Sequence, residues 1–326
     1  MSKNTTNKEK GRKLSECIAY YEICNRAEGK SPKTIDWYSA NLNIFHRYLR
    51  DRHLPDSVDV IETKLLREYI LYLQKKGRFS NRPDTAKKPS LLSTATIHAH
   101  VRTLRAFISW LTREGLVGAD IAKGIKPPKM MKKVVSILSD EEIRAIFKTF
   151  NPTNPFDIRN ETIVMLLFDT GLRIGELINL RMADVHMNEG YLKVLGKGNK
   201  ERIVPIGSNA QKALQRYLFR YRAKKPYAES DRVFLSIHGQ SLSVNSMKLM
   251  FARLAKSSGV SRLHAHLCRH TFATRFLVNG GDVFTLQQIL GHSSLEMVRN
   301  YVNLASSHIA VQHRKFSPLD HMNLCR

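Results

Sequence analysis

Helical periodicity, with a start signal ahead of each repeat, is the feature that most constrains how the first third of this chain folds. Ser31 and Pro32 supply a capping side chain and a first-turn proline, and apolar residues then recur at helical spacing up to position 49. A second amphipathic pattern begins near Ser93, and residues 61–73 between the two predict a further helix. The apolar positions are Ile35, Tyr38, Leu42, Phe45 and Leu49 in the first repeat and Ile97, Val101, Leu104, Ile108 and Leu111 in the second. These patterns predict an all-helical domain over residues 14–117.

The charge of the chain indicates its partner. The 326 residues, enough for about two domains, carry 53 Lys and Arg against 28 Asp and Glu, a formal charge of +25. Residues 1–136 hold 27 basic and 13 acidic side chains, and residues 137–326 hold 26 and 15. Because distributed cations favour phosphate binding through counterion release, we expect both halves to contact a polyanion. Charge alone is equally compatible with a ribosomal or chromatin-like structural protein.

Composition also suggests where the domains begin and end. Residues 1–13 are polar and basic and predict a flexible arm, whereas residues 77–89 form a polar, basic loop. Residues 118–136 contain Pro127 and Pro128 among several lysines and predict an extended basic linker. Ser139 and Glu142 then match a capping box that opens the next helix. We therefore expect a second domain over 137–305 and a short tail over 306–326.

The second domain combines helices with one hairpin. Residues 163–168 are a buried apolar run, and Gly171 separates it from a helix that starts at Arg173. Residues 191–195 and 202–206 predict two strands joined by a glycine-containing turn with Lys197 and Lys200 at its tip. Helices are expected over 263–279, 284–290 and 295–303, with Tyr301 on the last. The fold class is therefore mainly α with a small β-sheet.

Each polar residue singled out here has an ordinary structural interpretation as well. Arg173 could pair with Asp169 or Glu176, the turn lysines could serve solubility, and Tyr301 could be a packing residue. Taken one at a time, these alternatives are favoured. Taken together, the order of the set predicts chemistry on a phosphodiester: Arg173, Lys197, His266, Arg269, His292 and Tyr301.

Other classes of protein fit the sequence less well. Cys17, Cys24, Cys268 and Cys325 lack metal-site spacing and are expected to be reduced thiols. The N-terminus lacks the apolar core of a signal peptide, and no run of about 18 apolar residues is present. We expect a cytoplasmic protein that does not enter a membrane.

Four short segments carry the candidate residues: Thr-Gly-Leu-Arg-Ile-Gly-Glu at 170–176, Gly-Lys-Gly-Asn-Lys at 196–200, His-Leu-Cys-Arg-His at 266–270, and Leu-Gly-His at 290–292 with Tyr301 nine positions later. Together they resemble the tyrosine recombinase (phage integrase) family, which includes integrases of mobile elements and chromosome-dimer-resolving recombinases. The resemblance is strong over 138–307 and weaker over 14–116. The loop at 77–89 departs from the simplest family members.

The resemblance implies a role for each matching residue and no cofactor or metal. Arg173 and Arg269 would hold the scissile phosphate and Tyr301 would attack it. Lys197 would act as general acid, with Lys200 as a competitor for that role. His266 would assist proton transfer, His292 would bond the phosphate and Glu176 would brace the site. The expected DNA contacts are Arg102, Arg105, Lys126, Lys129, Lys132, Lys133 and Lys200.

The function that the resemblance implies is site-specific DNA recombination through a 3′-phosphotyrosine intermediate and a Holliday junction. A homotetramer would act on two double-stranded DNA sites with inverted repeats. Each protomer would form a C-shaped clamp, with an all-helical core-binding domain and a mixed α/β catalytic domain, and the tail over 306–326 would dock on a neighbour. The alternatives are a type IB topoisomerase-like enzyme that relaxes DNA and a non-catalytic DNA-binding regulator.

Overall fold

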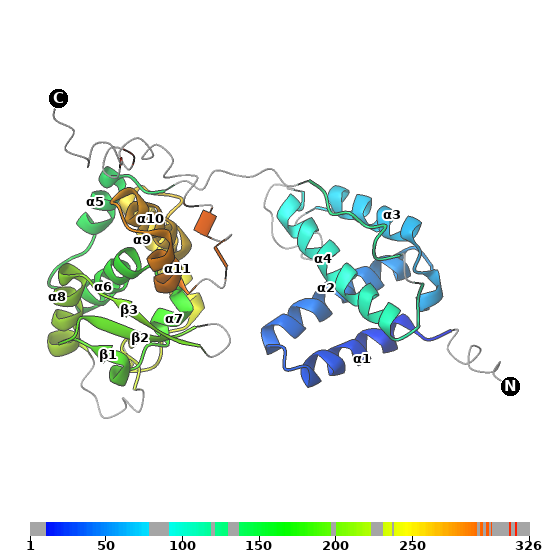
Figure 1. The fold of residues 1–326 in the computed structure, drawn as a ribbon, viewed down its shortest axis with the longest axis horizontal. Helices are drawn as coiled ribbons and strands as arrows, with labels where there is room; N and C mark the ends of the chain where they lie inside the picture. Colours follow the sequence, from blue (N-terminus) through cyan, green and yellow to red (C-terminus); the bar gives the residue numbers. More distant parts are fainter. Residues whose placement is uncertain are drawn as a thin grey trace. The chain divides into compact units, whose positions relative to one another are not determined.

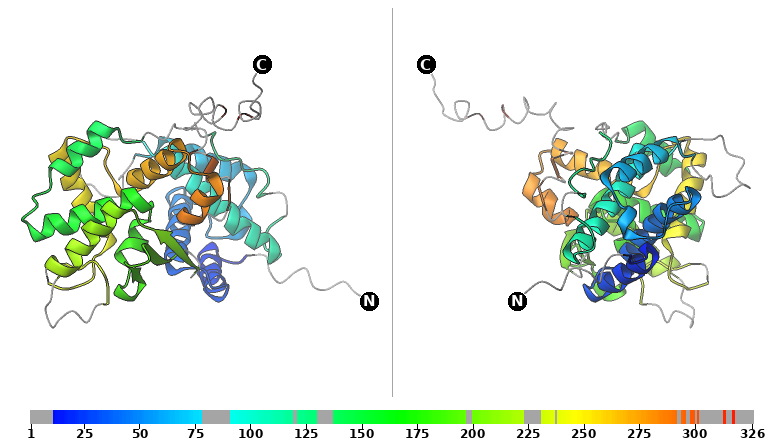
Figure 2. Two further views of the ribbon diagram at one scale, coloured as in Figure 1. Left: turned by 60° about the vertical axis from the view of Figure 1, so that its left-hand side comes forward. Right: turned by 90° about the vertical axis from the view of Figure 1, so that its right-hand side faces the viewer.

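The chain divides into two compact units, residues 1–132 and 133–326. The structure is a computed structural model, drawn in Figure 1 and from two further sides in Figure 2. The structure describes residues 11–77, 91–118, 121–129, 137–196, 200–222, 231–236, 238–291, 294–295, 298–299, 301, 313 and 317.

The described part of the N-terminal unit is helical, as predicted. Ser31 caps α2 and Ser93 caps α4, each by accepting a hydrogen bond from the backbone N–H three residues later. Helix α2 packs against α1 and α4, and α3 packs against α4. The elements are α1 (Leu14–Ala27), α2 (Pro32–Asp51), the short 3-10 helix η1 (Val58–Val60), α3 (Thr63–Lys75) and α4 (Thr94–Arg113).

Aromatic side chains make up much of the core of this unit. The Tyr21 ring lies 5.3 Å from Phe107 and 5.1 Å from Trp110, joining α1 to α4. The Phe45 and Tyr69 rings, 4.9 Å apart and edge to face, join α2 to α3. Edge-to-face contacts stabilise a core beyond the area they bury, so these pairs help to fix how the helices pack.

The prediction of an extended linker over residues 118–136 is wrong for residues 121–125, which pack against the N-terminal unit. Ile125 is fully buried in the core of the N-terminal unit, with Ile121 and Ala122 partly buried against it. The close approach of Gly124 to Thr63 and a hydrogen bond from Arg67 to the Gly124 carbonyl, at 3.4 Å, hold this stretch against α3. Proline and lysine content suggested a linker, but the isoleucines decide the packing because burying them removes apolar surface from water.

The C-terminal unit is mixed α/β in its described part. Its elements are α5 (Asp140–Lys148), α6 (Pro155–Thr170), α7 (Ile174–Ile178), η2 (Met182–Asp184), β1 (Val185–His186), β2 (Tyr191–Leu195), β3 (Glu201–Pro205), α8 (Ser208–Arg216), the π-helical turn η3 (Tyr217–Tyr221), α9 (Val244–Ser258), α10 (Ala265–Val278) and α11 (Val283–Leu290). The predicted capping box of Ser139 and Glu142 is present at the start of α5.

The strands form one antiparallel sheet in the order β1-β2-β3. The β2–β3 register pairs Leu195 with Glu201 and Tyr191 with Pro205, and the hydrogen bond from the Gly196 N–H to the Lys200 carbonyl, 2.8 Å, closes the base of the hairpin. Helix α11 contacts β3. The hairpin predicted from the glycine-containing turn is therefore present, with β3 shifted by one residue.

Helix α10 links the two hydrophobic clusters of the C-terminal unit. Leu267 and Cys268 on α10 are buried in the larger cluster, and Phe272 and Leu277 lie in a smaller one with Tyr301. The helix packs against both α6 and α11. Polar residues on α10 are thereby placed next to the end of α6 and the end of α11.

Among the described residues, no helix is both long enough and apolar enough to cross a membrane.

Candidate active site

The site begins at the turn between α6 and α7. Gly171 ends α6 in the left-handed conformation, with φ 61°, and a Cβ at this position would lie 2.4 Å from the Phe272 ring. Only glycine fits here, because other residues would be strained at this φ and would clash with that ring. Arg173 follows as the residue that precedes the first turn of α7. The tight turn thus places Arg173 beside the ends of two other helices.

Glu176 is a buried carboxylate that holds two arginines. It accepts hydrogen bonds from the Arg173 backbone N–H at 2.9 Å and from Arg173 Nη1 at 2.8 Å. Arg202 on β3 reaches the same carboxylate with two nitrogens, at 3.1 and 2.8 Å. Burial favours a higher pKa for Glu176, but the hydrogen bonds from Arg202 and Arg173 outweigh it and hold the pKa below its usual range. Glu176 is therefore a carboxylate that braces both arginines.

Arg202 also contacts the segments around the site. Its Nε donates to the Ile289 carbonyl near the end of α11, at 2.8 Å. A Cβ at Gly196 would lie 3.1 Å from Arg202 Nη1, and one at Gly291 would lie 3.0 Å from the same atom. Both glycines directly precede a predicted site residue, Lys197 and His292. Arg202 thus links the base of the hairpin to the end of α11.

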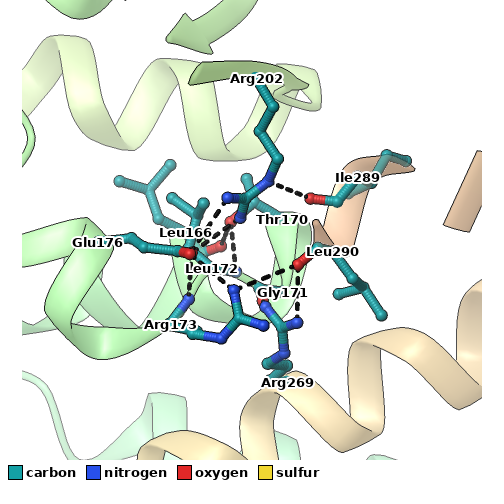
Figure 3. Close-up of polar contacts among 10 residues, drawn as sticks. All are labelled: Leu166, Thr170, Gly171, Leu172, Arg173, Glu176, Arg202, Arg269, Ile289 and Leu290. Carbon is teal, nitrogen blue, oxygen red and sulfur yellow. Dashed lines mark hydrogen bonds and ion pairs between the residues drawn. The ribbon is translucent and has the colours of Figure 1, made fainter. Parts of the chain in front are cut away.

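Arg269 is the second arginine that the sequence predicted, and it lies deeper than Arg173. It is 4% exposed, whereas the Arg173 side chain is 35% exposed. Arg269 donates to the Gly171 carbonyl at 2.6 Å and to the Leu290 carbonyl at 2.8 Å, and Arg173 reaches the Leu290 carbonyl at 3.5 Å. Figure 3 shows the two arginines meeting at this carbonyl.

Burial and the nearby Arg173 lower the pKa of Arg269 to about 10. The guanidinium group therefore remains charged at neutral pH. Arg173, Arg202 and Arg269 carry three positive charges, and Glu176 carries one negative charge among them. Positive charge in excess at a partly dehydrated site favours binding of an anion, and paired guanidinium groups match the geometry of a phosphate.

Tyr301 lies against the same arginine. It is 4% exposed and belongs to the cluster formed by α10 and α11, and its hydroxyl forms a hydrogen bond with the Arg269 side chain. Its oxygen also lies 2.9 Å from His270 Nδ1. Burial raises the pKa of Tyr301, although Arg269 and Arg173 oppose that effect. The phenol is therefore protonated at neutral pH in the free protein.

The structure brings together four of the residues predicted for the site: Arg173, Glu176, Arg269 and Tyr301. His266 lies one turn before Arg269 on α10 with an exposed side chain, and burial, followed by Arg269 and other nearby charged groups, lowers its pKa. Lys197 and His292 lie outside the described residues. The ordinary structural interpretation of Arg173, a pairing with Asp169 or Glu176, is met by Glu176, and the Arg173 side chain remains 35% exposed in that pair.

The residues predicted to contact DNA lie on both units. In the N-terminal unit, the described ones lie on α4 or in the segment that follows α4. In the C-terminal unit, the described one lies at the hairpin. All of them have exposed side chains. Arg102 also lies over the Trp37 ring, 5.7 Å from its centroid. The exposed residues are Arg102, Arg105, Lys126, Lys129 and Lys200, whereas Lys132, Lys133 and most of the tail over 306–326 lie outside the described residues.

Sequence reasoning missed two residues of the site, Arg202 and His270. In the sequence, Arg202 looks like an ordinary strand residue. Its position two residues after the turn lysine Lys200 is the signal that could have placed it near the site. His270 was noticed as part of the segment 266–270 but received no role. In the part of the chain that the structure describes, no group of three or more His, Cys, Asp or Glu side chains could hold a metal ion.

Comparison with known proteins identifies the family. The profile of the phage integrase family matches residues 136–308, and that of the phage integrase N-terminal SAM-like domain matches residues 18–115. The tyrosine recombinase XerD of Halalkalibacterium halodurans is 32% identical over 292 residues, covering 89% of this chain and 93% of the relative. The tyrosine recombinase XerC of Staphylococcus epidermidis is 31% identical over 281 residues, covering 86% and 89%.

Solved structures share the fold. The XerH site-specific recombinase in a post-cleavage complex with palindromic difH substrate has a TM-score of 0.67 at 21% identity, covering 92% of this chain and 84% of that one. A lambda integrase dimer bound to a COC′ core site has a TM-score of 0.66 at 20% identity, covering 88% and 97%. With both profiles matched, and with relatives similar over most of the chain, this protein belongs to the phage integrase family and is a tyrosine recombinase, an enzyme that cleaves and rejoins DNA strands.

Proposed function

We propose that this protein is a site-specific recombinase in which Tyr301 attacks the scissile phosphate and forms a 3′-phosphotyrosine. The observation that carries the proposal is the contact of Arg269 with the Tyr301 hydroxyl, because it places a phosphate-binding cation beside the nucleophile. Attack builds negative charge on the nonbridging oxygens, and guanidinium groups fixed in advance stabilise that charge without reorganising. Arg269 and Arg173, which meet at the Leu290 carbonyl, fill this role.

The remaining roles are those that membership of the family implies for the matching residues. The 5′ oxygen leaves as an alkoxide and needs a proton, which Lys197 supplies from the turn between β2 and β3. His266 assists proton transfer, and His292, directly after the end of α11, bonds the phosphate. Glu176 braces both arginines. The phosphotyrosine bond conserves the energy of the broken linkage, so rejoining requires no external energy source.

The proposed substrate is double-stranded DNA with an inverted-repeat core site. Relatives support this choice, since XerH was solved with difH substrate and an integrase of the transposon Tn1549 with circular intermediate DNA. Positive charge on both units supports DNA contacts from each, by Arg102 and Arg105 on α4 and by Lys200 at the hairpin. We propose a homotetramer on two such sites in the cytoplasm, with the tail over 306–326 docking on a neighbour. A Holliday junction would form between the first and second strand exchanges, and a mobile element is the proposed genetic context.

Strand exchange between two labelled duplexes tests this function. Each duplex would carry inverted repeats taken from the DNA that adjoins the gene, with a different dye on each. We expect products that carry one end from each duplex, together with a branched junction intermediate. Tyr301→Phe should give neither product. Relaxation of supercoiled DNA without joined products would instead assign the protein to the type IB topoisomerase-like class.

A further inference from the structure

His270 faces the nucleophile from the same helix as Arg269. Its Nδ1 lies 2.9 Å from the Tyr301 oxygen, and the two rings are inclined at 47° with their centroids 5.5 Å apart. The side chain is partly exposed on α10, so it can exchange protons with solvent. This contact joins a titratable group to the atom that attacks phosphorus, and none of the roles assigned above uses it.

The tautomer of His270 sets the direction of this contact, because either the imidazole Nδ1 or the Tyr301 hydroxyl can be the donor. The guanidinium group of Arg269 can only donate, so the Tyr301 oxygen accepts from it. In the tautomer with its proton at Nε2, His270 accepts the single hydroxyl proton of Tyr301 at Nδ1. A histidine that accepts at Nδ1 is neutral and carries its own proton at Nε2.

The surroundings of His270 favour the neutral form. Burial lowers the pKa of His270, and the neighbouring His266, Arg269 and His264 add to that effect. Tyr301, in contrast, has a raised pKa because it is buried. At neutral pH this tautomer of His270 gives a protonated phenol and an unprotonated imidazole nitrogen 2.9 Å apart, which is the ground state that general-base catalysis requires.

We propose that His270 is a catalytic residue that takes the hydroxyl proton of Tyr301 as the tyrosine attacks. This inference rests on the proposed function of Tyr301. As the bond from the tyrosine oxygen to phosphorus forms, the proton moves to His270 Nδ1. The bond from phosphorus to the 5′ oxygen breaks, and that oxygen takes a proton from Lys197. In rejoining, the 5′ hydroxyl returns its proton to Lys197 and the departing tyrosine oxygen recovers its proton from His270.

Two substitutions separate proton transfer from positioning. The probe is a nicked duplex carrying the inverted repeats, on which cleavage traps the covalent adduct in a single turnover. His270→Ala removes the imidazole, and His270→Gln keeps a hydrogen-bond acceptor that cannot take the proton. We expect both variants to bind DNA like the wild type and to cleave about 10²–10⁴-fold more slowly. His264→Gln is the matched control, since His264 hydrogen-bonds to the Arg262 backbone carbonyl and, of the three side chains that lower the pKa of His270, has the smallest effect. This variant should cleave within threefold of the wild type.

Chemical rescue separates a base from a structural residue, because added base raises the cleavage rate only if the missing side chain takes a proton. Added imidazole should restore part of the cleavage by His270→Ala. Replacing Tyr301 with a fluorinated, more acidic tyrosine should also narrow the gap between wild type and His270→Ala, because a more acidic phenol needs less help from a base. A His270→Gln variant that cleaves within threefold of the wild type would overturn the proposal, as would a His270→Ala defect that neither treatment changes.

A measurement on the unsubstituted protein covers the case in which the variants do not fold. Nitrogen-15 NMR of labelled histidine should report His270 with Nε2 protonated and Nδ1 unprotonated, and a proton on Nδ1 would overturn the proposal. Tyr301→Phe, assayed in parallel, tests the role of Tyr301 as nucleophile separately from the role of His270 as base. An adduct formed by Tyr301→Phe would reject the proposed function itself. Absence of that adduct, with wild-type cleavage by His270→Gln, would reject only the role of His270.

Discussion

The two units of this protein differ in what they bury. The N-terminal unit packs aromatic and aliphatic side chains, such as Tyr69 and Phe107, around α4. Among the described residues, the buried Asp, Glu, Lys and Arg side chains are Glu176, 9% exposed, and Arg269, 4% exposed, and both belong to the C-terminal unit. An apolar core needs only matching shapes, whereas a buried charge needs specific partners and destabilises the fold when one is lost. Substitutions in the two units should therefore have different consequences.

The largest effect is expected at the hairpin of the C-terminal unit. Lys197→Ala should slow cleavage by about 10²–10⁴-fold, because the leaving oxygen loses its proton donor. A substrate with sulfur at the 5′ bridging position should largely restore the rate, since a thiolate leaves without a proton. Lys200→Ala is the control from the same turn. If the sulfur substrate restored the cleavage rate of Lys200→Ala but not that of Lys197→Ala, Lys200 would be the general acid instead of Lys197.

Arg202→Met should give the next largest effect. The substitution keeps much of the side-chain volume but leaves Glu176 without its bidentate partner, and removing one partner of a buried ion pair destabilises by about 3–5 kcal/mol. Denaturant unfolding measures the loss. In the double variant with Glu176→Gln, the two losses should not add, because each substitution breaks the same contact. Additive losses would show that Arg202 and Glu176 act independently.

In the N-terminal unit, Leu66→Ala should lower stability without changing the chemistry. Leu66 is fully buried in α3, and truncating a buried leucine costs about 2–5 kcal/mol. At saturating DNA and at a temperature where the variant is folded, cleavage should stay within threefold of the wild type. Leu71→Ala, on the same helix at a position 56% exposed, should change neither property. If Leu66→Ala slowed the chemical step, the core of the N-terminal unit would affect catalysis as well as stability, and the two units would not differ in this respect.

The smallest expected effect is on the salt dependence of DNA binding. If both units contact phosphates, each unit alone should bind more weakly and with a shallower salt dependence than the whole chain. Each lost phosphate contact should reduce the slope of log K against log salt by about 0.9. Replacing Lys126, Lys129, Lys132 and Lys133 with glutamine should also lower the affinity of the full chain. A C-terminal unit that matched the affinity and slope of the whole chain would contradict DNA contacts from the N-terminal unit.

Local signals predicted much of this fold from the sequence. The caps at Ser31, Ser93 and Ser139 and the hairpin turn at Gly196 act over a few residues, so a single sequence reveals them. The buried position of Ile125 depends on the shape of a core assembled from distant helices, and composition alone concealed it.

The site was predicted only in part for the same reason. Residue types and order indicated Arg173, Arg269 and Tyr301, and the structure brings them together. Arg202 contacts Glu176 across 26 positions and Ile289 across 87, and no periodicity or spacing encodes contacts of that range. His270 lies in a recognisable segment, but its contact with Tyr301 depends on how Tyr301 packs into the small hydrophobic cluster of α10 and α11.

The most direct test of the account is to locate the covalent bond to DNA. A nicked duplex carrying the inverted repeats would be incubated with the wild type, the adduct digested with protease, and the peptide bearing the nucleotide identified by mass spectrometry. We predict a 3′-phosphate linked to Tyr301, and no adduct from Tyr301→Phe although that variant still binds DNA. An adduct on any other residue, or one that survives in Tyr301→Phe, would contradict the account.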